Sequence, residues 1–293
     1  MSVEATAKRA PASIEEARER VHCGWARVAD SWSRHADYVD AQAAQITEKM
    51  LDLTRPQPGE RVVELACGPG GSGLAAAPMV GPEGEVLMSD VVPGMTAIAA
   101  ARAAGLGLRN VSTQVLDLER INLRAASYDV VLCRDGLMFA VEPASAASEI
   151  RRILRPGGRV ALAVWGPPAD NPWLGAVFDG VGAVIGATLP PPGLPGPFAL
   201  DSAERLARLL SDAGLAEVAV HELRLRRRAE SFQAWWSRTS ALAGPLSAML
   251  ASLPPHVITA IRARLQDEVS PYATGEGLDF PALALIASGR VGA

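Results

Sequence analysis

The feature that most constrains the fold is a repeated alternation of strand and helix patterns in the middle of the chain. Near its start, the segment RVVELACGPGGSGLAAAPMV combines a short β-branched run, a glycine-rich turn and an alanine-rich helical pattern. Four further strands are predicted at Glu85–Ser89, Val111–Val115, Tyr128–Cys133 and Arg159–Trp165, and helices at Gly94–Ala104, Pro143–Leu154 and Ser202–Gly214. Because this alternation is typical of parallel sheets, the sequence predicts an α/β domain.

Two later strands and a helical insertion complete the predicted domain. The strands are expected at Val218–Arg226 and Phe280–Ser288. The intervening segment has helical patterns around Ser231–Leu253 and His256–Val269. These patterns indicate a helical lid over residues 229–273 that is inserted between the last two strands.

The remaining boundaries are placed from the local composition. Residues 1–12 are polar, alanine-rich and interrupted by a proline, which predicts a disordered tail. Apolar residues at helical spacing then predict an N-terminal helical cap over residues 13–55. The main domain is expected over residues 56–293, and its proline- and glycine-rich segment 167–198 is predicted to be a variable loop at the mouth of a site.

The composition excludes several classes of function. With 49% apolar residues and a formal net charge of -4, the 293-residue chain has the composition of a globular protein. The lack of a long basic block argues against an electrostatic grip on nucleic acid. Three scattered cysteines and four separated histidines provide neither a disulfide framework nor a metal-ligand pattern. Apolar runs are too short to span a membrane and the N-terminus lacks a secretory signal, so a cytoplasmic location is expected.

A glycine-rich loop follows the first predicted strand and indicates a ligand site. The pattern G-x-G-x-x-G runs from Gly68 to Gly73, and the helix predicted from Ser72 points its N-terminal dipole at the same place. Gly68 and Gly70 let the backbone approach a ligand closely because they have no Cβ. Asp90 lies 22 residues after Gly68 at the end of the second strand, where a carboxylate can accept hydrogen bonds from two ribose hydroxyls. The loop therefore predicts a ligand that contains a nucleoside.

Two ligands of this kind compete, a nicotinamide dinucleotide and S-adenosylmethionine, and Glu64 separates them. This acid lies in the first strand, four residues before Gly68. Beside a pyrophosphate it would add charge repulsion, whereas the ammonium and sulfonium groups of S-adenosylmethionine are positive. The chain also lacks a second mononucleotide-binding half after residue 165. The pattern favours S-adenosylmethionine, and a nicotinamide-dependent oxidoreductase remains an alternative.

On these residues and several further segments, the chain resembles the class I S-adenosylmethionine-dependent methyltransferases. Within them it is similar to the small-molecule group of ubiquinone and menaquinone biosynthesis. The resemblance covers roughly residues 55–165 and includes the segments Val62–Gly70, Ser89–Met95, Asp117-Leu118, Tyr128–Cys133 and Glu149–Arg159. It implies a Rossmann-like fold with a seven-stranded, mostly parallel sheet whose last strand is antiparallel, together with the helical cap and the helical insertion.

The resemblance also implies a cofactor site, residue by residue. Asp117 matches the acid that hydrogen-bonds the adenine amine in the family, and Met95 is expected to pack under the adenine. The implied contacts are Glu64, Ala66, Gly68, Gly70, Asp90, Val91, Met95, Asp117, Leu118, Cys133 and Arg134. Ala66 stands where many relatives have glycine, but this position mainly offers a backbone carbonyl, so cofactor binding is still expected.

Methyl transfer from a sulfonium requires a closely positioned acceptor and the exclusion of water, so no single catalytic constellation is obligatory. Where the acceptor must lose a proton, a histidine or carboxylate near the methyl group can serve as the base. His35 in the cap is the first candidate, and Asp135 after the fourth strand is the second. Acceptor contacts are expected from Trp32, Tyr38, Phe139, Trp173 and Trp236.

The variable parts of the chain predict the kind of acceptor. Large apolar side chains are common in them and cations are few, which favours a small apolar or aromatic metabolite of the kind found in secondary metabolism. The basic run Arg224–Arg228 is interpreted as protection of a sheet edge and not as an RNA-binding patch. The expected partner is a small-molecule methyl acceptor, with neither nucleic acid nor a membrane span, and the sequence leaves a homodimer open. A catalytically silent cofactor-binding protein of the same fold is the alternative outside the enzymes.

Overall fold

A mixed sheet organises the protein, whose computed structural model describes residues 11–191 and 194–292. Its strands are β1 (Arg61–Glu64), β2 (Glu85–Asp90), β3 (Val111–Val115), β4 (Tyr128–Arg134), β5 (Leu154–Trp165), β6 (Ala216–Ala229), β7 (Ala273–Thr274) and β8 (Gly277–Arg290). The order is β3-β2-β1-β4-β5-β8-β6, and the short β7 pairs with β8 beside this path. The first five strands pair in parallel, whereas β8 runs antiparallel to β5 and β6. The predicted Rossmann-like sheet with an antiparallel last strand is confirmed.

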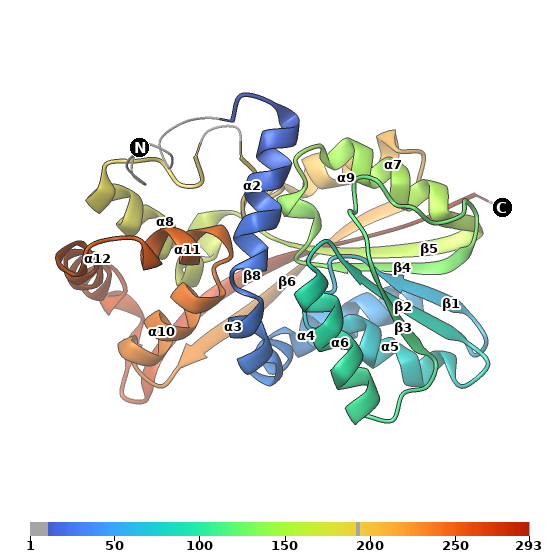
Figure 1. The fold of residues 1–293 in the computed structure, drawn as a ribbon, viewed down its shortest axis with the longest axis horizontal. Coiled ribbons are helices and arrows are strands. Elements are labelled where there is room, and N and C mark those ends of the chain that lie inside the picture. The colour runs from blue at the N-terminus through green and yellow to red at the C-terminus, as the bar shows by residue number, and fades with distance from the viewer. Residues whose placement is uncertain (1–10, 192–193, 293) are drawn as a thin grey trace.

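Helices cover both faces of the sheet because each crossover between parallel strands needs a connection that returns over one face. Figure 1 shows α4 (Ala36–Thr54), α5 (Ser72–Val80) and α6 (Pro93–Gly105) on one side. On the other side lie α7 (Pro143–Ile153), which packs against β5, and α9 (Ala203–Asp212), which packs against β6 and β8. With both faces covered, every residue of β4 except Arg134 is buried, which explains the apolar run Val130–Cys133 within it.

The segment predicted as an N-terminal cap contains α2 (Ile14–Ala26), α3 (Ala29–Arg34) and α4. Ser13 begins α2 by accepting a hydrogen bond from the Glu16 N–H at 3.1 Å. In Figure 1, α2 lies between the sheet and the helices that follow β6. The tail predicted over residues 1–12 lies outside the described residues except for its last two positions.

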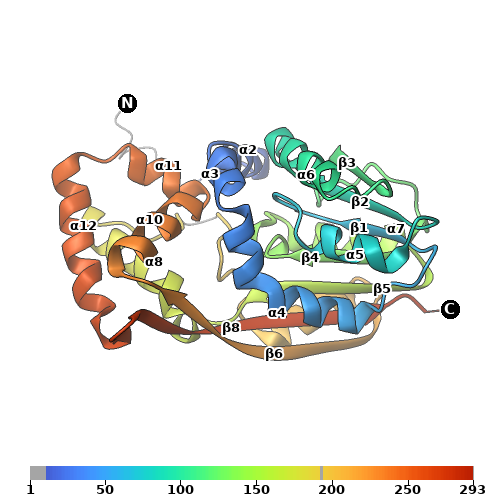
Figure 2. The same ribbon diagram turned by 90° about the horizontal axis from the view of Figure 1, so that it is seen from below.

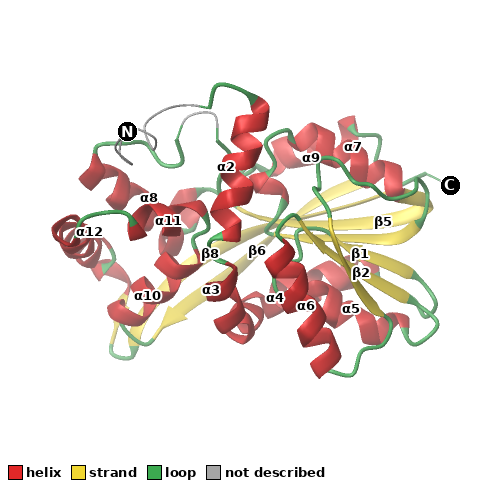
Figure 3. Ribbon diagram, viewed as in Figure 1, coloured by secondary structure: helices red, strands yellow, loops and turns green. Residues whose placement is uncertain are grey.

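The antiparallel strands β6 and β8 extend beyond the rest of the sheet. Pairing of β5 with β8 ends at Trp165 and Ala284, but β6 and β8 remain paired as far as Ala229 and Leu278. Figure 2 shows these two strands reaching the helices of the predicted insertion. Those helices, red in Figure 3, are α10 (Phe232–Leu242), α11 (Pro245–Ala251) and α12 (Pro255–Glu268). Each strand is longer than predicted, and the added residues connect the sheet to the lid.

The segment 167–198, predicted to be a variable loop, contains the helix α8 (Pro172–Ile185), so the prediction of a loop was wrong there. Its three glycines suggested a loop, but they allow close packing. A Cβ on Gly180 would lie only 2.5 Å from Leu265 Cδ2 of α12. Three short 3₁₀ segments complete the structure: η1 (Leu137–Phe139), η2 (Pro168–Asp170) and η3 (Ser270–Tyr272).

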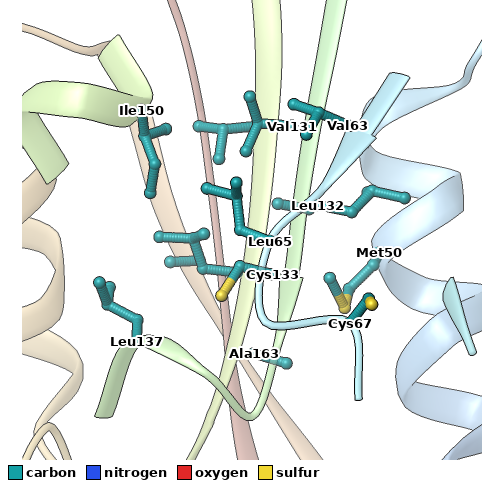
Figure 4. Close-up of a cluster of buried hydrophobic side chains, with 14 of the residues drawn as sticks. Met50, Val63, Leu65, Cys67, Val131, Leu132, Cys133, Leu137, Ile150 and Ala163 are labelled. Atoms are coloured by element: carbon teal, nitrogen blue, oxygen red, sulfur yellow. The ribbon is translucent and has the colours of Figure 1, made fainter. Parts of the chain in front are cut away.

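The two largest apolar cores both include residues of α8. The larger core surrounds the sheet, and Figure 4 shows part of it, including Met50, Leu65 and Cys133. The smaller one joins α8, the lid helices and the far ends of β6 and β8, and Phe280 and Ile261 are completely buried in it. Among the described residues, no helix combines the length and hydropathy that crossing a membrane requires.

The side chain of Asn171 extends the hydrogen bonding of the sheet after β5 ends. It is completely buried, its Oδ1 accepts the Leu283 N–H, and its Nδ2 donates to Leu283 O, both at 3.0 Å. The same Nδ2 also donates to Gly166 O and Pro167 O at 3.1 and 3.2 Å. One amide therefore holds the loop after β5 against β8.

Replacing this amide is expected to destabilise the protein. Asn171→Ala leaves the Leu283 N–H buried without a partner, and we expect the free energy of unfolding to fall by about 2–4 kcal/mol. Urea unfolding monitored by circular dichroism measures the change. The matched control is the half-buried neighbour, Asp170→Ala, for which the change should stay within about 0.5 kcal/mol because it loses only a long surface ion pair with Arg224. Equal effects of the two substitutions would contradict the role given to Asn171.

Candidate active site

Two cavities meet beyond the carboxyl ends of the parallel strands, where sheets of this kind place their ligands. The smaller has a volume of about 110 Å³ and lies against the glycine-rich loop and the end of β2. The larger has a volume of about 600 Å³ and lies between the cap, α8 and the lid helices. Five residues line both: Trp25, Trp32, Val39, Asp135 and Phe139. The site therefore consists of two adjacent, differently lined cavities with these residues at their common border.

Glu64 braces the glycine-rich loop from beneath. Its carboxylate accepts the Ser72 N–H at 3.0 Å and the Gly73 N–H at 2.8 Å, which are the first two backbone donors of α5. Glu64 lines the smaller cavity but is only 1% exposed, and burial raises the pKa of its carboxyl group. Both carboxylate oxygens of Glu64, which the sequence had indicated as a partner of a positively charged ligand, therefore bind the N-terminus of α5.

Asp90 orders the same loop from the end of β2. Its Oδ2 accepts the Gly68 N–H and its Oδ1 accepts the Val92 N–H, both at 2.9 Å. The side chain lines the smaller cavity, and burial raises its pKa. Each carboxylate oxygen can accept a further hydrogen bond, so the geometry leaves capacity for a diol.

Most of the predicted cofactor contacts lie around the smaller cavity, and two do not. The predicted contacts that line it are Glu64, Ala66, Gly68, Asp90, Val91, Met95, Asp117, Leu118 and Arg134. Cys133 is instead completely buried in the core, where burial raises the pKa of its thiol to about 12. Gly70 lies behind the loop with φ +83°, and a Cβ there would be 2.9 Å from Met88 Sδ. Gly70 therefore shapes the turn, and Cys133 packs behind the site.

Ion pairs and a hydrogen bond connect the cap to two residues that line the smaller cavity, Glu119 and Arg134. The buried Arg18 of α2 donates from Nε and Nη2 to the buried Glu119 at 3.0 and 2.7 Å, and also pairs with Glu142. On α4, Asp40 and Thr47 accept hydrogen bonds from Arg134 at 3.2 and 2.7 Å. Neither Arg18 nor Glu119 was predicted, because residues far apart in sequence give no local signal of a buried pair.

Asp135 lies at the junction of the two cavities in an unusual state. Its backbone has φ +56°, in the left-handed region that non-glycine residues rarely adopt. Among the described residues its shielded Oδ1 has no hydrogen-bond partner. Burial raises the pKa of Asp135 to about 6, although the charges of Arg134 and Arg227 act in the opposite direction. A carboxylate with these properties is suited to take up a proton near neutral pH.

His35, the first sequence candidate for a base, lies elsewhere. It joins α3 to α4, and its Nδ1 is 2.8 Å from Ser31 O in the preceding turn. It is absent from the described lining of both cavities. We therefore assign His35 to the helix junction, and of the two predicted bases only Asp135 reaches the site.

The larger cavity has aromatic walls, as predicted, with one change of residue. Trp32, Tyr38, Phe139 and Trp173 line it. Trp236 instead belongs to the smaller core, and the preceding residue, Trp235, faces the cavity and donates from Nε1 to Trp173 O at 2.9 Å. Adjacent positions on a helix point about 100° apart, so this choice depended on the rotation of α10.

The prediction that cations are few around the acceptor was wrong. Five arginines are found among the described residues that line the larger cavity, and Asp135 is the one acid among them. The arginines are Arg20, Arg27, Arg227, Arg228 and Arg238, contributed by α2, the turn after it, β6 and α10. Only the folded chain brings these separate elements to one cavity.

The interpretation of the basic run as edge protection holds for three of its arginines but not for Arg227. On the edge strand β6, Arg224, Arg226 and Arg228 are exposed. Arg227 lies on the opposite face of the strand, the face that it shares with the buried Leu225 and Ala229. Its guanidinium lines the larger cavity. The period-two pattern would have revealed this if the predicted strand had continued past Arg226.

Comparisons with known proteins agree with this architecture. A family profile described as "Methyltransferase domain" matches residues 62–158. The nocamycin O-methyltransferase of Saccharothrix syringae is 31% identical over 243 residues, which cover 78% of this chain and 85% of that protein. The aklanonic acid methyltransferase of Streptomyces sp. (strain C5) is 36% identical over 114 residues, covering 39% of this chain and 52% of that protein.

More distant likenesses follow the same pattern. A ubiquinone/menaquinone biosynthesis C-methyltransferase of Ectopseudomonas mendocina is 32% identical over 130 residues, covering 44% of this chain and 50% of that protein. The chain thus spans about half the length of this relative and of the Streptomyces one. The crystal structure of a putative methyltransferase from Bacillus halodurans has the same fold, with a TM-score of 0.59, 19% identity and coverage of 84% of this chain and 99% of that one.

The fold is that of the Rossmann-like methyltransferases, with the ligand cavities at the carboxyl ends of the parallel strands. The chain belongs to the family of S-adenosylmethionine-dependent methyltransferases. The family and the cofactor predicted from the sequence are thereby confirmed.

The state of Asp135 predicts a pH dependence of stability. Its pKa is about 6 in the folded protein against 3.8 for an ordinary aspartate, so between these values the folded state binds more protons than the unfolded state. The contribution of Asp135 to stability therefore falls as pH rises through this window, by at most about 3 kcal/mol.

Asp135→Asn removes this dependence. We expect the variant to gain stability relative to the wild type on going from pH 4 to pH 7.5, as measured by urea unfolding at both values. Asp170→Asn, at a half-buried position outside the lining of both cavities, serves as the control and should show no such gain. A difference between wild type and Asp135→Asn that is the same at both pH values would contradict the raised pKa.

Proposed function

We propose that the protein transfers a methyl group from S-adenosylmethionine to a small, largely apolar or aromatic metabolite and releases S-adenosylhomocysteine. The observation that carries the proposal is the junction of two cavities at Asp135. One compartment has the glycine-rich loop and acids suited to a nucleoside, and the other has aromatic walls. The names of two relatives, a nocamycin and an aklanonic acid methyltransferase, support a natural product as the acceptor.

The donor set around the smaller cavity fits the proposed cofactor. Asp90 would accept the ribose hydroxyls, since both of its oxygens retain acceptor capacity. Val91, Met95 and Leu118 offer apolar contacts for adenine, and Asp117 an acceptor for its amine. Glu64, the Ala66 backbone, Gly68 and Arg134 border the place left for the charged amino-acid end. When bound, S-adenosylmethionine supplies an already activated methyl group.

The residues of the junction would orient the acceptor and exclude water. Trp25 contacts Trp32 and Phe139 edge to face, with ring centroids 5.8 and 4.8 Å apart, so three rings form a wall shared by both cavities. Methyl transfer from an activated donor gains most from such positioning of the acceptor. Asp135 beside this wall would take the proton that the acceptor loses, because its raised pKa matches a base working near neutral pH.

Cofactor binding is tested first by calorimetric titration with S-adenosylmethionine and S-adenosylhomocysteine. We expect micromolar binding to the wild type and a loss of at least about tenfold in Asp90→Ala and Glu64→Ala, because one removes the diol acceptor and the other the brace of the loop. Asp212→Ala, at the exposed end of α9, is the control and should bind normally. Binding of NAD(H) in place of these compounds would overturn the proposal.

Turnover is tested by following S-adenosylhomocysteine with a panel of phenols, quinones and prenyl compounds. With a base of pKa about 6, the rate should rise with pH up to about 7 and then level off. Asp135→Asn should lower it by about 10²–10⁴-fold, whereas His35→Ala should keep the wild-type profile. An unchanged rate in Asp135→Asn would exclude this base.

The same assay separates an enzyme from a catalytically silent protein. A protein that binds S-adenosylmethionine but forms no product with any acceptor in the panel would favour a role in regulation or assembly. Product formation that depends on both an acceptor and an intact Asp90 would favour the methyltransferase.

A further inference from the structure

Arg227 is held rigidly between two aromatic rings at the wall of the larger cavity. Its guanidinium carbon lies 4.9 Å from the ring centroid of Trp165 and 5.0 Å from that of Trp173. Its Nη1 donates to Gln42 O and Gln42 Oε1 at 3.0 and 3.2 Å. Stacking and these two hydrogen bonds fix the plane of the guanidinium, so little conformational freedom would be lost when it binds a ligand.

The remaining donors of this guanidinium are not satisfied by the described part of the chain. Nε is shielded from solvent and has no hydrogen-bond partner, and Nη2 makes none either. No acid of the described residues forms an ion pair with Arg227. Its neighbours in the cavity differ, since Arg228 pairs with Asp279 and Arg238 with Glu230. The charge of Asp135 acts on Arg227 without an ion pair between them, so an anionic ligand in direct contact would compensate the buried cation further.

The rest of the cavity supports an anionic ligand with a flat apolar body. Arginines outnumber acids five to one among its described lining residues. The rings of Trp165 and Trp173 pack edge to face, with their centroids 5.2 Å apart. The other walls of the cavity are largely aromatic or apolar. The register that pairs Arg227 with Phe280 places the guanidinium past the end of β5, on the same side as Asp135.

We propose that Arg227 binds an anionic oxygen of the methyl acceptor, either a carboxylate or an ionised enol. The proposal rests on the proposed function, because it takes the larger cavity as the acceptor site. The acceptor is then an aromatic or polycyclic acid whose planar body lies among the tryptophans while its charged oxygen reaches Arg227. Arg227 is a specificity-determining residue in this arrangement, and Asp135 remains the group at the junction with the smaller cavity.

The test compares anions with neutral compounds of nearly the same shape. Calorimetric titrations use 2-naphthoate against 2-naphthamide for the carboxylate, and 2-hydroxy-1,4-naphthoquinone against its methyl ether for the ionised enol. We expect the wild type at pH 7.5 to prefer the anion by at least tenfold in one pair or both. The pair that shows the preference identifies the source of the anionic oxygen.

Variants then assign the preference to one residue. Arg227→Gln should abolish it, because the amide keeps hydrogen-bonding capacity but lacks the charge. Arg227→Lys should retain part of it, since an ammonium keeps the charge without the planar fork. Arg226→Gln, at the exposed preceding position and outside the lining of both cavities, is the matched control and should keep the full preference. Arg227→Met, whose unbranched chain can occupy the stacked position, replaces Arg227→Gln if that variant does not fold.

Two results would overturn the proposal: a wild type with no preference for either anion, or a preference that persists in Arg227→Gln or Arg227→Met. Folding of each variant is checked by its binding of S-adenosylmethionine in the smaller cavity. The titrations require no turnover, so they are independent of the test of methyl transfer. Product formed from neutral acceptors without any anion preference would keep the proposed function and reject only the role of Arg227.

Discussion

The pairing of β6 with β8 is the constraint on which the rest of the structure depends. Within the sheet, β8 lies between β5 and β6, but beyond Trp165 it pairs with β6 and, at its first residues, with the short β7. The two strands therefore leave the sheet as an antiparallel ribbon, and α10, α11 and α12 are connected to its end. Without this extension the carboxyl ends of the parallel strands would lack the lid that encloses the larger cavity.

Buried carboxylates lie around the cavities, although burying an acid lowers the stability of the folded protein unless the acid is hydrogen-bonded. Glu64 and Asp90 each accept two backbone N–H groups, so their burial also orders the glycine-rich loop. The buried carboxylate of Asp135 is not compensated in this way, because its Oδ1 lacks a hydrogen-bond partner in the described structure. Its backbone is also left-handed. Unfavourable features of this kind persist where surrounding packing imposes them, and they gather at functional sites.

Local patterns in the sequence were sufficient for the sheet and the cofactor loop, because a strand, a glycine turn and a helix are each encoded within a few residues. Nine of the predicted cofactor contacts surround one cavity for that reason. The acceptor side was predicted less well. Whether Trp235 or Trp236 faces the cavity depended on the rotation of α10, which local patterns do not determine. The position of Arg227 in the cavity depended on how far β6 extends. The helix α8 was missed because its glycines, which pack against α12 and η2, read as loop residues.

The two separate apolar cores have a consequence for how such a protein can change. The core around the sheet holds the cofactor loop, whereas the core beneath the lid is built from α8, α10, α11, α12 and the ends of the ribbon. Among the described residues, only Trp173 and Phe178 pack against both. Substitutions or insertions in the lid can therefore reshape the larger cavity while the smaller cavity keeps its geometry. A chain of this design can change the shape of one cavity by exchanging one module, with the glycine-rich loop left intact.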